Sequence, residues 1–443
     1  MEKKSLNLSD YTVGWLCALG EEASAARWML DKKHDFPKVR PTDTNSYTYG
    51  EINGHNVAIA QIPTGQTGKS GAARMTVQFS QSFQSIRIFL FVGIGGGVPI
   101  NPYIKPELKD NEFIHLGDVV VGSPKWAGVP AIIEYDRGRC TTDGHVATSL
   151  IDQPIPQLIG VVDTIERNDE DGEPPFHRHL AMLAPERLEK YGVKTESLRN
   201  RFQYPGSEFD ILCTPESVHP KNEDTCTNSP QVLRPKRNSD KPVFHRGPIA
   251  SGDLVMQNGK ERDRLSAECH KAIRFETEAA GVMIDTHSLV IRGISDYADS
   301  HKPYRWHNYA AATAAAFARQ VLEELAPRNL EGVRARPLSV QSGPGNILTP
   351  VSSNSMISPI PEVPDTSDPM LNRVEAPPGA FQHQRGGVAG RSGGYAGPSA
   401  PMNYEESIVH PRAESAWGIA APLTPLGDNN LLLERLHIRD DKC

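Results

Sequence analysis

Up to about residue 327, short apolar runs that fit buried strands alternate with longer segments of helical periodicity. The clearest run, "IRIFLFVGI" at 86–94, is apolar at nearly every position, as expected of a central strand buried on both faces. Helical patterns at 21–33 and 70–83 stand on either side of another apolar run at 55–62. This alternation predicts a single large α/β domain.

The same patterns place the remaining elements of the domain. Further strands are expected at 11–19, 117–123, 131–136 and 288–295, and further helices at 261–273 and 308–325. Asn308 is a candidate N-cap for the last helix. The acidic stretch "ERNDEDGEPP" at 166–175 is expected to be a solvated loop.

The composition changes sharply near residue 327. Beyond it, stretches such as "QSGPGNILTPVSSNSMISPIPEVP" and "GGVAGRSGGYAGPSAP" are rich in Pro, Ser and Gly and offer few residues to bury. We therefore divide the chain into a folded domain at 1–328, which would carry any active site, and a disordered tail at 329–443.

Charge and cysteine usage exclude several classes of function. With a formal net charge of -7, the chain has no basic field for a nucleic acid. No run of 18 apolar residues is present, and the N-terminus lacks the apolar stretch of a signal peptide. The six cysteines include no C-x-x-C pair, which favours a reducing, cytoplasmic location without a metal framework, and no cofactor is expected.

Two glycine-rich stretches resemble nucleotide motifs without matching them. "GQTGKS" at 65–70 has Pro63 where a P-loop needs its first glycine. "GIGGGVP" at 93–99 has Val98 where a dinucleotide fingerprint needs its third glycine. The second run offers bare backbone against which a ligand can lie, although a tight turn would have the same composition.

Acidic residues gather around the strand expected at 288–295. Asp296 follows the carboxyl end of that strand, where open α/β sheets place their ligands. Asp299 is also a candidate to cap the following turn. Upstream, Glu276 and Glu278 begin a helical segment, and Arg292 lies within the strand itself. A solvated helix face would explain the two glutamates alone, but not the whole group.

These motifs together resemble the purine and uridine phosphorylase superfamily, in particular its fungal branch. The resemblance covers roughly residues 11–325 and is carried, in order, by "YTVGWLCALGEE", "FVGIGGGVP", "GPIASGDLVM", "FETEAAGVM" and "LVIRGISDYADSHKPYRWHNYAAATAAAFARQVL". It implies a three-layer α/β sandwich with a twisted mixed sheet, in a dimer or trimer of identical chains. Members cleave nucleosides with either phosphate or water.

The resemblance also implies roles for individual residues. Asp296 corresponds to the general acid that protonates a departing purine, and Glu278 to the carboxylate that binds the ribose hydroxyls. To act near neutral pH, Asp296 would have to be partly desolvated or share a proton with the base. Glu22 aligns with the glutamate that orients the attacking water in nucleosidases, and Arg292 would help to position water or ribose.

Other positions depart from the family pattern. Thr277 replaces a methionine beneath the ribose, and Val255 replaces a stacking phenylalanine. The base is then expected between Val255, Met256, Gly95, Gly96 and Ser295. The 5′ substituent is not assigned; the histidines considered for it, each with a structural interpretation as well, are His115, His219, His245 and His301.

The choice between water and phosphate depends on two loops. Phosphorylases of this type carry Gly-Asp-x-x-Arg after the first strand and Arg-x-Gly-Ser at the central one, but this chain has "ALGEE" and "FVGI". We therefore expect hydrolysis of a purine nucleoside, with a phosphate-dependent phosphorylase as the alternative. A nucleoside-binding sensor module without turnover remains a second alternative.

Overall fold

The computed structural model describes residues 6–99 and 112–333, apart from positions 124, 127, 143, 152, 174, 221–225, 227, 236, 238 and 331. All of these residues fall within one of the two compact units of the chain. The tail predicted at 329–443 lies, beyond Val333, outside the described residues. No helix in the described part of the chain has the length and apolar character needed to cross a membrane.

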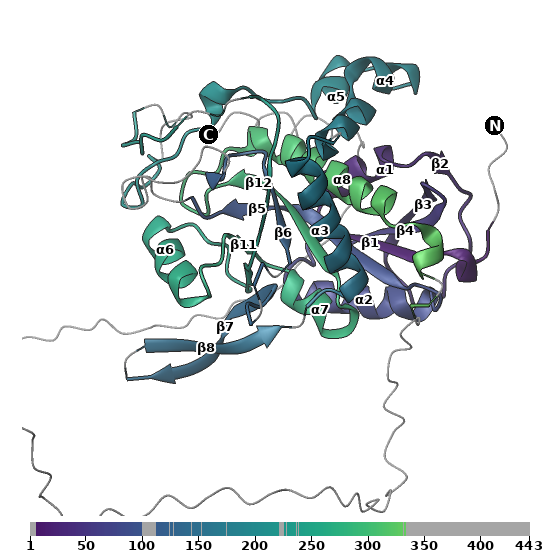
Figure 1. Ribbon diagram of the computed structural model, residues 1–443, viewed down its shortest axis with the longest axis horizontal. Coiled ribbons are helices and arrows are strands. Elements are labelled where there is room, and N and C mark those ends of the chain that lie inside the picture. Colours follow the sequence, from purple (N-terminus) through teal and green to yellow (C-terminus); the bar gives the residue numbers. More distant parts are fainter. Residues whose placement is uncertain are drawn as a thin grey trace, which may run out of the picture. The chain divides into compact units, whose positions relative to one another are not determined.

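A mixed sheet of twelve strands forms the centre of this unit (Figure 1). The strands are β1 (Val13–Cys17), β2 (Lys32–Lys33), β3 (Ser46–Ile52), β4 (His55–Gln61), β5 (Ile88–Gly97), β6 (Val119–Gly122), β7 (Ile132–Thr141), β8 (Gly144–Ile151), β9 (Phe244–Gly247), β10 (Ile249–Ser251), β11 (Arg274–Glu276) and β12 (Leu289–Asp296). Their main order is β2-β3-β4-β1-β5-β11-β10-β7-β8, and β12, β6 and β9 branch from β5.

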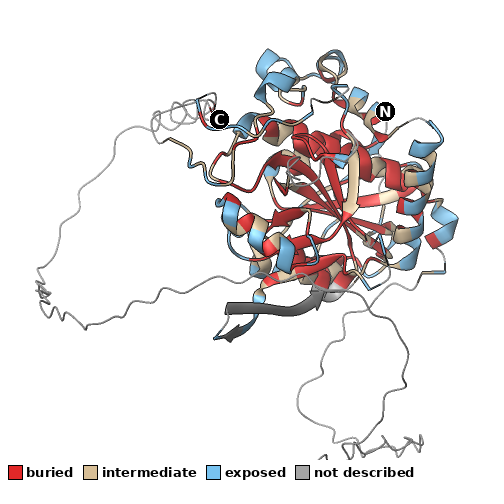
Figure 2. Ribbon diagram, turned by 60° about the vertical axis from the view of Figure 1, so that its left-hand side comes forward, coloured by how far each residue is buried: buried red, intermediate tan, exposed pale blue. Residues whose placement is uncertain are grey.

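Helices cover both faces of the sheet. They are α1 (Gly20–Trp28), α2 (Lys69–Ser82), α3 (Pro156–Glu170), α4 (Pro185–Lys190), α5 (Glu196–Asn200), α6 (Gly259–Glu268), α7 (Ala279–Thr286) and α8 (His307–Glu324). Helices α1, α3 and α8 pack in one core, and α2 and α7 pack in another. Figure 2 shows the buried strands between helices whose outer surfaces are exposed.

The alternation of side chains along single strands separates the two cores. On β12, Leu289 and Ile291 belong to the core beneath α8, whereas Val290 and Ile294 belong to the core beneath α2 and α7. A strand buried on both faces reads as an apolar run, which is why β5 and β12 were recognisable in the sequence. The three-layer α/β sandwich with a mixed sheet is confirmed.

Strand β5 is the point at which the sheet branches. It pairs in parallel with β1 and β12, and near its end Gly96 and Gly97 also pair with β11 in the antiparallel direction. A bulge in the β12 pairing falls between Ile294 and Asp296, which are opposite Gly95 and Gly96. The carboxyl ends of β5, β11 and β12 are thereby brought together.

Two local predictions were wrong. Residues 166–170, predicted to be in a loop, form the last turn of α3, because Val162 and Ile165 on its inner face are buried and extend the helix. Trp306, not Asn308, is the N-cap of α8, because a 3-10 turn at Tyr304–Trp306 leads directly into the helix.

Residues just beyond the predicted boundary at 328 pack on the domain. Leu330 is buried in the core, and the Arg87 guanidinium donates hydrogen bonds to the carbonyl oxygens of Leu330 and Val333 at 2.6 and 2.8 Å. The packed part of the chain therefore includes these positions.

Candidate active site

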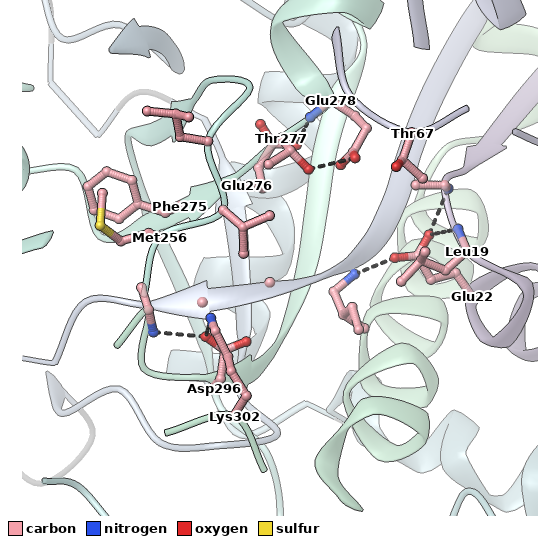
Figure 3. Close-up of a pocket in the computed structure, with 17 residues that line it drawn as sticks. Leu19, Glu22, Thr67, Met256, Phe275, Glu276, Thr277, Glu278, Asp296 and Lys302 are labelled. Atoms are coloured by element: carbon pink, nitrogen blue, oxygen red, sulfur yellow. Dashed lines mark hydrogen bonds and ion pairs between the residues drawn. The ribbon is translucent and has the colours of Figure 1, made fainter. Parts of the chain in front are cut away.

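A cavity of about 210 Å³ opens where β5, β11 and β12 end. The predicted site residues that line it are Glu22, Gly95, Gly96, Val255, Met256, Thr277, Glu278 and Asp296. Figure 3 shows Asp296 and Lys302 at one end, Glu22 and Leu19 at the other, and Glu278 on the wall between them. The structure thus brings together Glu22 and Asp296, which are 274 positions apart in the chain.

Glu22 forms the first end of the cavity and is almost fully buried. It lies in the first turn of α1, and its Oε2 accepts hydrogen bonds from the backbone N–H groups of Ala18 and Leu19 at 2.7 and 2.9 Å. Its Oε1 accepts a third from the N–H of Ile94 at 2.8 Å. Burial nevertheless raises the pKa of Glu22 to about 7, because these bonds and Arg292 only partly offset the loss of water.

Arg292 does not line the cavity but lies behind its wall. Its Nη2 donates to Glu276 Oε2 at 3.0 Å, and its guanidinium lies 3.7 Å from the centre of the Phe91 ring. Gly93 separates this guanidinium from Glu22: a Cβ there would come within 2.4 Å of Glu22 Oε1 and 2.7 Å of Arg292 Nη1. Glycine at 93 is therefore required by the close approach of two charged side chains.

A second buried guanidinium, that of Arg274, was not predicted. Its Nη2 donates to the carbonyl oxygen of Ile94, and a Cβ on Gly95 would overlap it at 1.6 Å. Burial and the neighbouring Arg292 lower the pKa of Arg274. The sequence predicted that a ligand could lie against the backbone of the glycine run. Charged side chains fill the space beside Gly93 and Gly95, so only part of the run is open to a ligand.

Glu276 ends β11 and Glu278 is the N-cap of α7, and the two side chains have different environments. Oε2 of Glu276 accepts from the N–H groups of Glu278 and Ala279 at 3.1 and 2.9 Å. Burial alone would raise its pKa, but Arg292 and Arg274 hold the pKa of Glu276 below its ordinary value. Burial and Glu276 instead raise the pKa of Glu278, which accepts hydrogen bonds from the Thr277 hydroxyl at 2.6 Å and the Gly68 N–H at 3.1 Å.

Asp296 forms the opposite end of the cavity and is paired with a lysine. Its Oδ1 accepts hydrogen bonds from Lys302 Nζ at 2.5 Å and from the Ala298 N–H at 2.8 Å. Its Oδ2 accepts from the Ser295 hydroxyl at 2.9 Å. Burial would raise the pKa of Asp296, but Lys302 and these hydrogen bonds hold it below its ordinary value.

Asp296 was expected to be partly desolvated or to share a proton with the base. It is buried, but the carboxylate is ionised at neutral pH and lies against an ammonium group. Ser295 is also displaced from its expected role: it does not line the cavity and instead supports Asp296. Asp299 caps its turn as predicted, through a 2.8 Å hydrogen bond from the His301 N–H.

An apolar wall lies between these charged ends. Met256 and Phe275 contribute to it from the segment after β10 and from β11, and Val255 lies beside them with 65% of its surface exposed. Figure 3 shows Met256 and Phe275 on the side of the cavity nearer Asp296. A flat aromatic ligand would therefore be in apolar contact at the end that carries the Asp296–Lys302 pair.

Several lining residues were missed by the sequence prediction. Lys302 follows Asp296 by six positions, and a lysine in "ADSHKPY" has no periodicity that indicates a cavity. Thr67 belongs to the stretch that resembled a P-loop, but the adjacent Lys69 is paired with Glu134 at 2.9 Å and Asp136 at 2.7 Å. A phosphate-binding lysine is therefore not available there.

The four histidines considered for the 5′ side lie elsewhere. His115 is paired with Asp210 at 2.7 Å and His245 with Asp118 at 3.0 Å. His219 and His301 contact one another, with ring centroids 5.4 Å apart. None of them is among the described residues that line the cavity.

Comparison with known proteins gives one long sequence match and several weak structural ones. No protein-family model matches the chain. A nucleotide-binding leucine-rich repeat (NLR)-like protein of Hyaloscypha variabilis is 34% identical over 344 residues, which is 77% of this chain but 32% of that protein. The chain therefore spans about a third of the length of this relative.

Among solved structures, a 5′-methylthioadenosine/S-adenosylhomocysteine nucleosidase from Neisseria meningitidis has 17% identity and a TM-score of 0.43, covering 71% of this chain and 99% of its own. Futalosine hydrolase of Helicobacter pylori has the same identity and TM-score, covering 71% and 98%.

Proposed function

We propose that this chain cleaves the N-glycosidic bond of a purine nucleoside, with water as the acceptor. The observation that carries this proposal is the placement of carboxylates with opposite pKa shifts, Glu22 and Asp296, at the two ends of one cavity. Hydrolysis of this bond needs a base for the attacking water on one side of the sugar and a proton for the leaving group on the other.

At the Asp296 end, the departing purine needs a proton on N7. Asp296 is ionised at neutral pH, so the proton is held on Lys302 Nζ, which donates it in a hydrogen bond to Asp296 Oδ1. As the bond between C1′ and N9 breaks, its electron pair leaves with the base and the Asp296–Lys302 pair supplies the proton. The pair thus acts as the general acid, the role that the family resemblance implies for Asp296 alone.

Between the ends, the sugar would lie against Glu278. This side chain and Thr277 line the cavity and present oxygens that suit ribose hydroxyls. Glu276 adds a carboxylate that its neighbouring arginines keep ionised. Negative charge on this wall would stabilise the positive charge that develops on the sugar as the base departs.

At the Glu22 end, a water molecule would be the nucleophile. With a pKa of about 7, Glu22 is partly ionised at neutral pH and can accept the proton of the water as oxygen bonds to C1′. Among the described residues that line the cavity, Lys302 is the only cation, and it lies at the opposite end. This arrangement favours water over phosphate, whose charge would be repelled by Glu22.

The NLR-like relative supports a second candidate function. This chain matches about a third of that protein, so the matched part is one region of a longer chain there. A module that senses a nucleoside would bind in the same cavity without turnover. The two candidates differ in whether Glu22 and the Asp296–Lys302 pair affect catalysis or only binding.

One experiment separates these possibilities. The full chain is incubated with adenosine, inosine, guanosine, uridine and methylthioadenosine, with and without phosphate, and free base and sugar products are separated by chromatography. We expect purine release without phosphate, and ribose rather than ribose 1-phosphate as the product. The double variant Glu22→Gln, Asp296→Asn is the inactive control. Strict dependence on phosphate would establish the phosphorylase, and saturable binding without any product would establish the sensor.

A further inference from the structure

Outside the cavity, three potential metal ligands converge on one point. The Cys213 and Cys226 sulfurs and a ring nitrogen of His301 all lie within 4.8 Å of one another. All three residues are buried, with exposures of 1%, 5% and 4%. The cysteines come from the segment at 211–232, whereas His301 follows β12, so the fold itself creates this cluster.

The imidazole of His301 is unusual for a buried polar group. Neither of its ring nitrogens has a hydrogen-bond partner of good geometry, although Nδ1 lies 3.4 Å from Asp299 Oδ1. A buried polar group without a partner is costly, and such groups are rare in folded proteins. A metal ion on Nε2 would satisfy the ring, and Asp299 would then hold the Nδ1–H in the way that carboxylates commonly orient metal-bound histidines.

The backbone on either side of Cys213 is hydrogen-bonded. Cys213 forms an isolated bridge with Gln231, and hydrogen bonds join Thr214 N to Pro230 O at 2.9 Å and Val232 N to Leu212 O at 2.8 Å. Further along, the N–H of His219 donates to the hydroxyl of Ser300, in the turn after β12, at 2.9 Å. Cys213 is therefore presented from a hydrogen-bonded backbone beside the turn that carries His301.

The chemistry of these ligands selects the metal. Thiolate and imidazole ligands together are typical of zinc, which takes four ligands in a tetrahedral arrangement at structural sites. The cluster supplies three of these ligands, two thiolates and one imidazole, and a water molecule would complete the tetrahedron. The site lies apart from the cavity, among buried residues, so the ion would serve the fold and not the reaction.

We propose that Cys213, Cys226 and His301 bind a structural zinc ion. The site was not recognisable from the sequence, because its ligands are spaced without a C-x-x-C pair. The ion would join the segment at 211–232 to the turn that contains Lys302, the residue adjacent to His301, and would thereby fix the lysine against Asp296. This inference does not depend on the activity proposed for the cavity.

The test uses the full chain, purified under reducing conditions without chelator from cells supplied with zinc. Metal content is measured by mass spectrometry, and we expect about one zinc per chain. Cys213→Ser, Cys226→Ser and His301→Ala should each lose most of it. The matched control is Cys269→Ser, which changes another buried cysteine outside the cluster and should keep its zinc.

A second measurement uses the unmodified chain, so its result does not depend on whether the variants fold. Zinc is removed from the unmodified chain with a chelator and replaced by cobalt(II), whose absorption shows thiolate-to-metal charge transfer only when cysteines bind it. We expect this band with one equivalent of cobalt and its loss on adding zinc. Absence of both zinc and the cobalt band would overturn the proposal, as would a disulfide between Cys213 and Cys226 in protein isolated with its thiols trapped.

Discussion

The two ends of the cavity hold similar carboxylates in opposite electrostatic states. Glu22 and Asp296 are both almost fully buried, and both accept hydrogen bonds from backbone N–H groups. Burial raises the pKa of Glu22 to about 7, whereas the pKa of Asp296 lies below its ordinary value. The difference is the cation: Lys302 contacts Asp296 directly, whereas Arg292 forms its ion pair with Glu276 and not with Glu22.

This contrast shows that the partner in contact, more than the depth of burial, sets the state of a buried carboxyl. A directly bonded ammonium compensates the loss of water at Asp296, while three neutral donors at Glu22 do not. One end is thus prepared to accept a proton near pH 7 and the other to hold a charge. The following substitutions test this difference, from the largest expected effect on turnover to the smallest.

Asp296→Asn should have the largest effect. It keeps the size of the side chain but removes the charge that holds Lys302, so turnover should fall by roughly 10²- to 10⁴-fold. Binding of a ribose-containing inhibitor, measured by calorimetry, should change little. Asp299→Asn is the matched control, because it alters a buried carboxylate that also caps a turn but does not line the cavity. Equal losses of turnover in both variants would rule out a separate role for Asp296.

Glu22→Gln should reduce turnover by roughly 10²-fold and change its dependence on pH. Because the ionised form is the base, kcat/KM of the unmodified chain should rise with pH and level off above a midpoint of about 7. The variant cannot titrate and should lack this rise. A pH profile with the same midpoint in the variant would assign the titration to another group.

The same substitution should alter the pH dependence of stability. Between the ordinary value of 4.5 and the folded value of about 7, the folded state holds more protons than the unfolded state, so stability falls as pH rises. From pH 5 to pH 8 the unmodified chain should therefore lose about 2.5 kcal/mol of unfolding free energy relative to Glu22→Gln, as measured by urea unfolding. A constant difference across this range would contradict the raised pKa.

Lys302→Met makes the two ends alike by removing the cation from Asp296. Turnover at neutral pH should fall by roughly 10²-fold, the low end for loss of a general acid, because Lys302 holds the proton that the departing base receives. Burial would then raise the pKa of Asp296, so the carboxyl itself should regain a proton as pH falls. We therefore expect the deficit of the variant to shrink at acidic pH. A deficit that is the same at every pH would indicate that Lys302 only shapes the cavity.

Ser295→Ala should have the smallest effect. It removes the hydroxyl that donates to Asp296 Oδ2 but leaves Lys302 and the Ala298 N–H in place. Turnover should fall by no more than about 10-fold, with little change in KM, since the hydroxyl does not line the cavity. A large rise in KM with unchanged kcat would instead support the original assignment of Ser295 to base binding.

The parts of the fold and site that were predictable are those encoded locally. Apolar runs identified β5 and β12, and the position of Asp296 after such a run indicated a ligand site. Lys302 could not be assigned in this way, because its contact with Asp296 depends on the path of the turn between them. The pairing of β5 with three strands and the Cys213–Cys226–His301 cluster are likewise products of long-range packing, which leaves no periodic signal in the sequence.

The branching of the sheet at β5 also determines when the cavity can form during folding. Its walls come from the start of α1, the end of β5, the start of α7 and the turn after β12, and these segments meet only after β1, β12 and β11 have all paired with β5. Such pairings join residues far apart along the chain and close slowly, because the entropy of a long loop is lost before the contacts form. Helices close their hydrogen bonds between residues only four apart, and α8 is the longest of those in the described part of the chain. A refolding chain is therefore expected to gain helical content before it has a binding site.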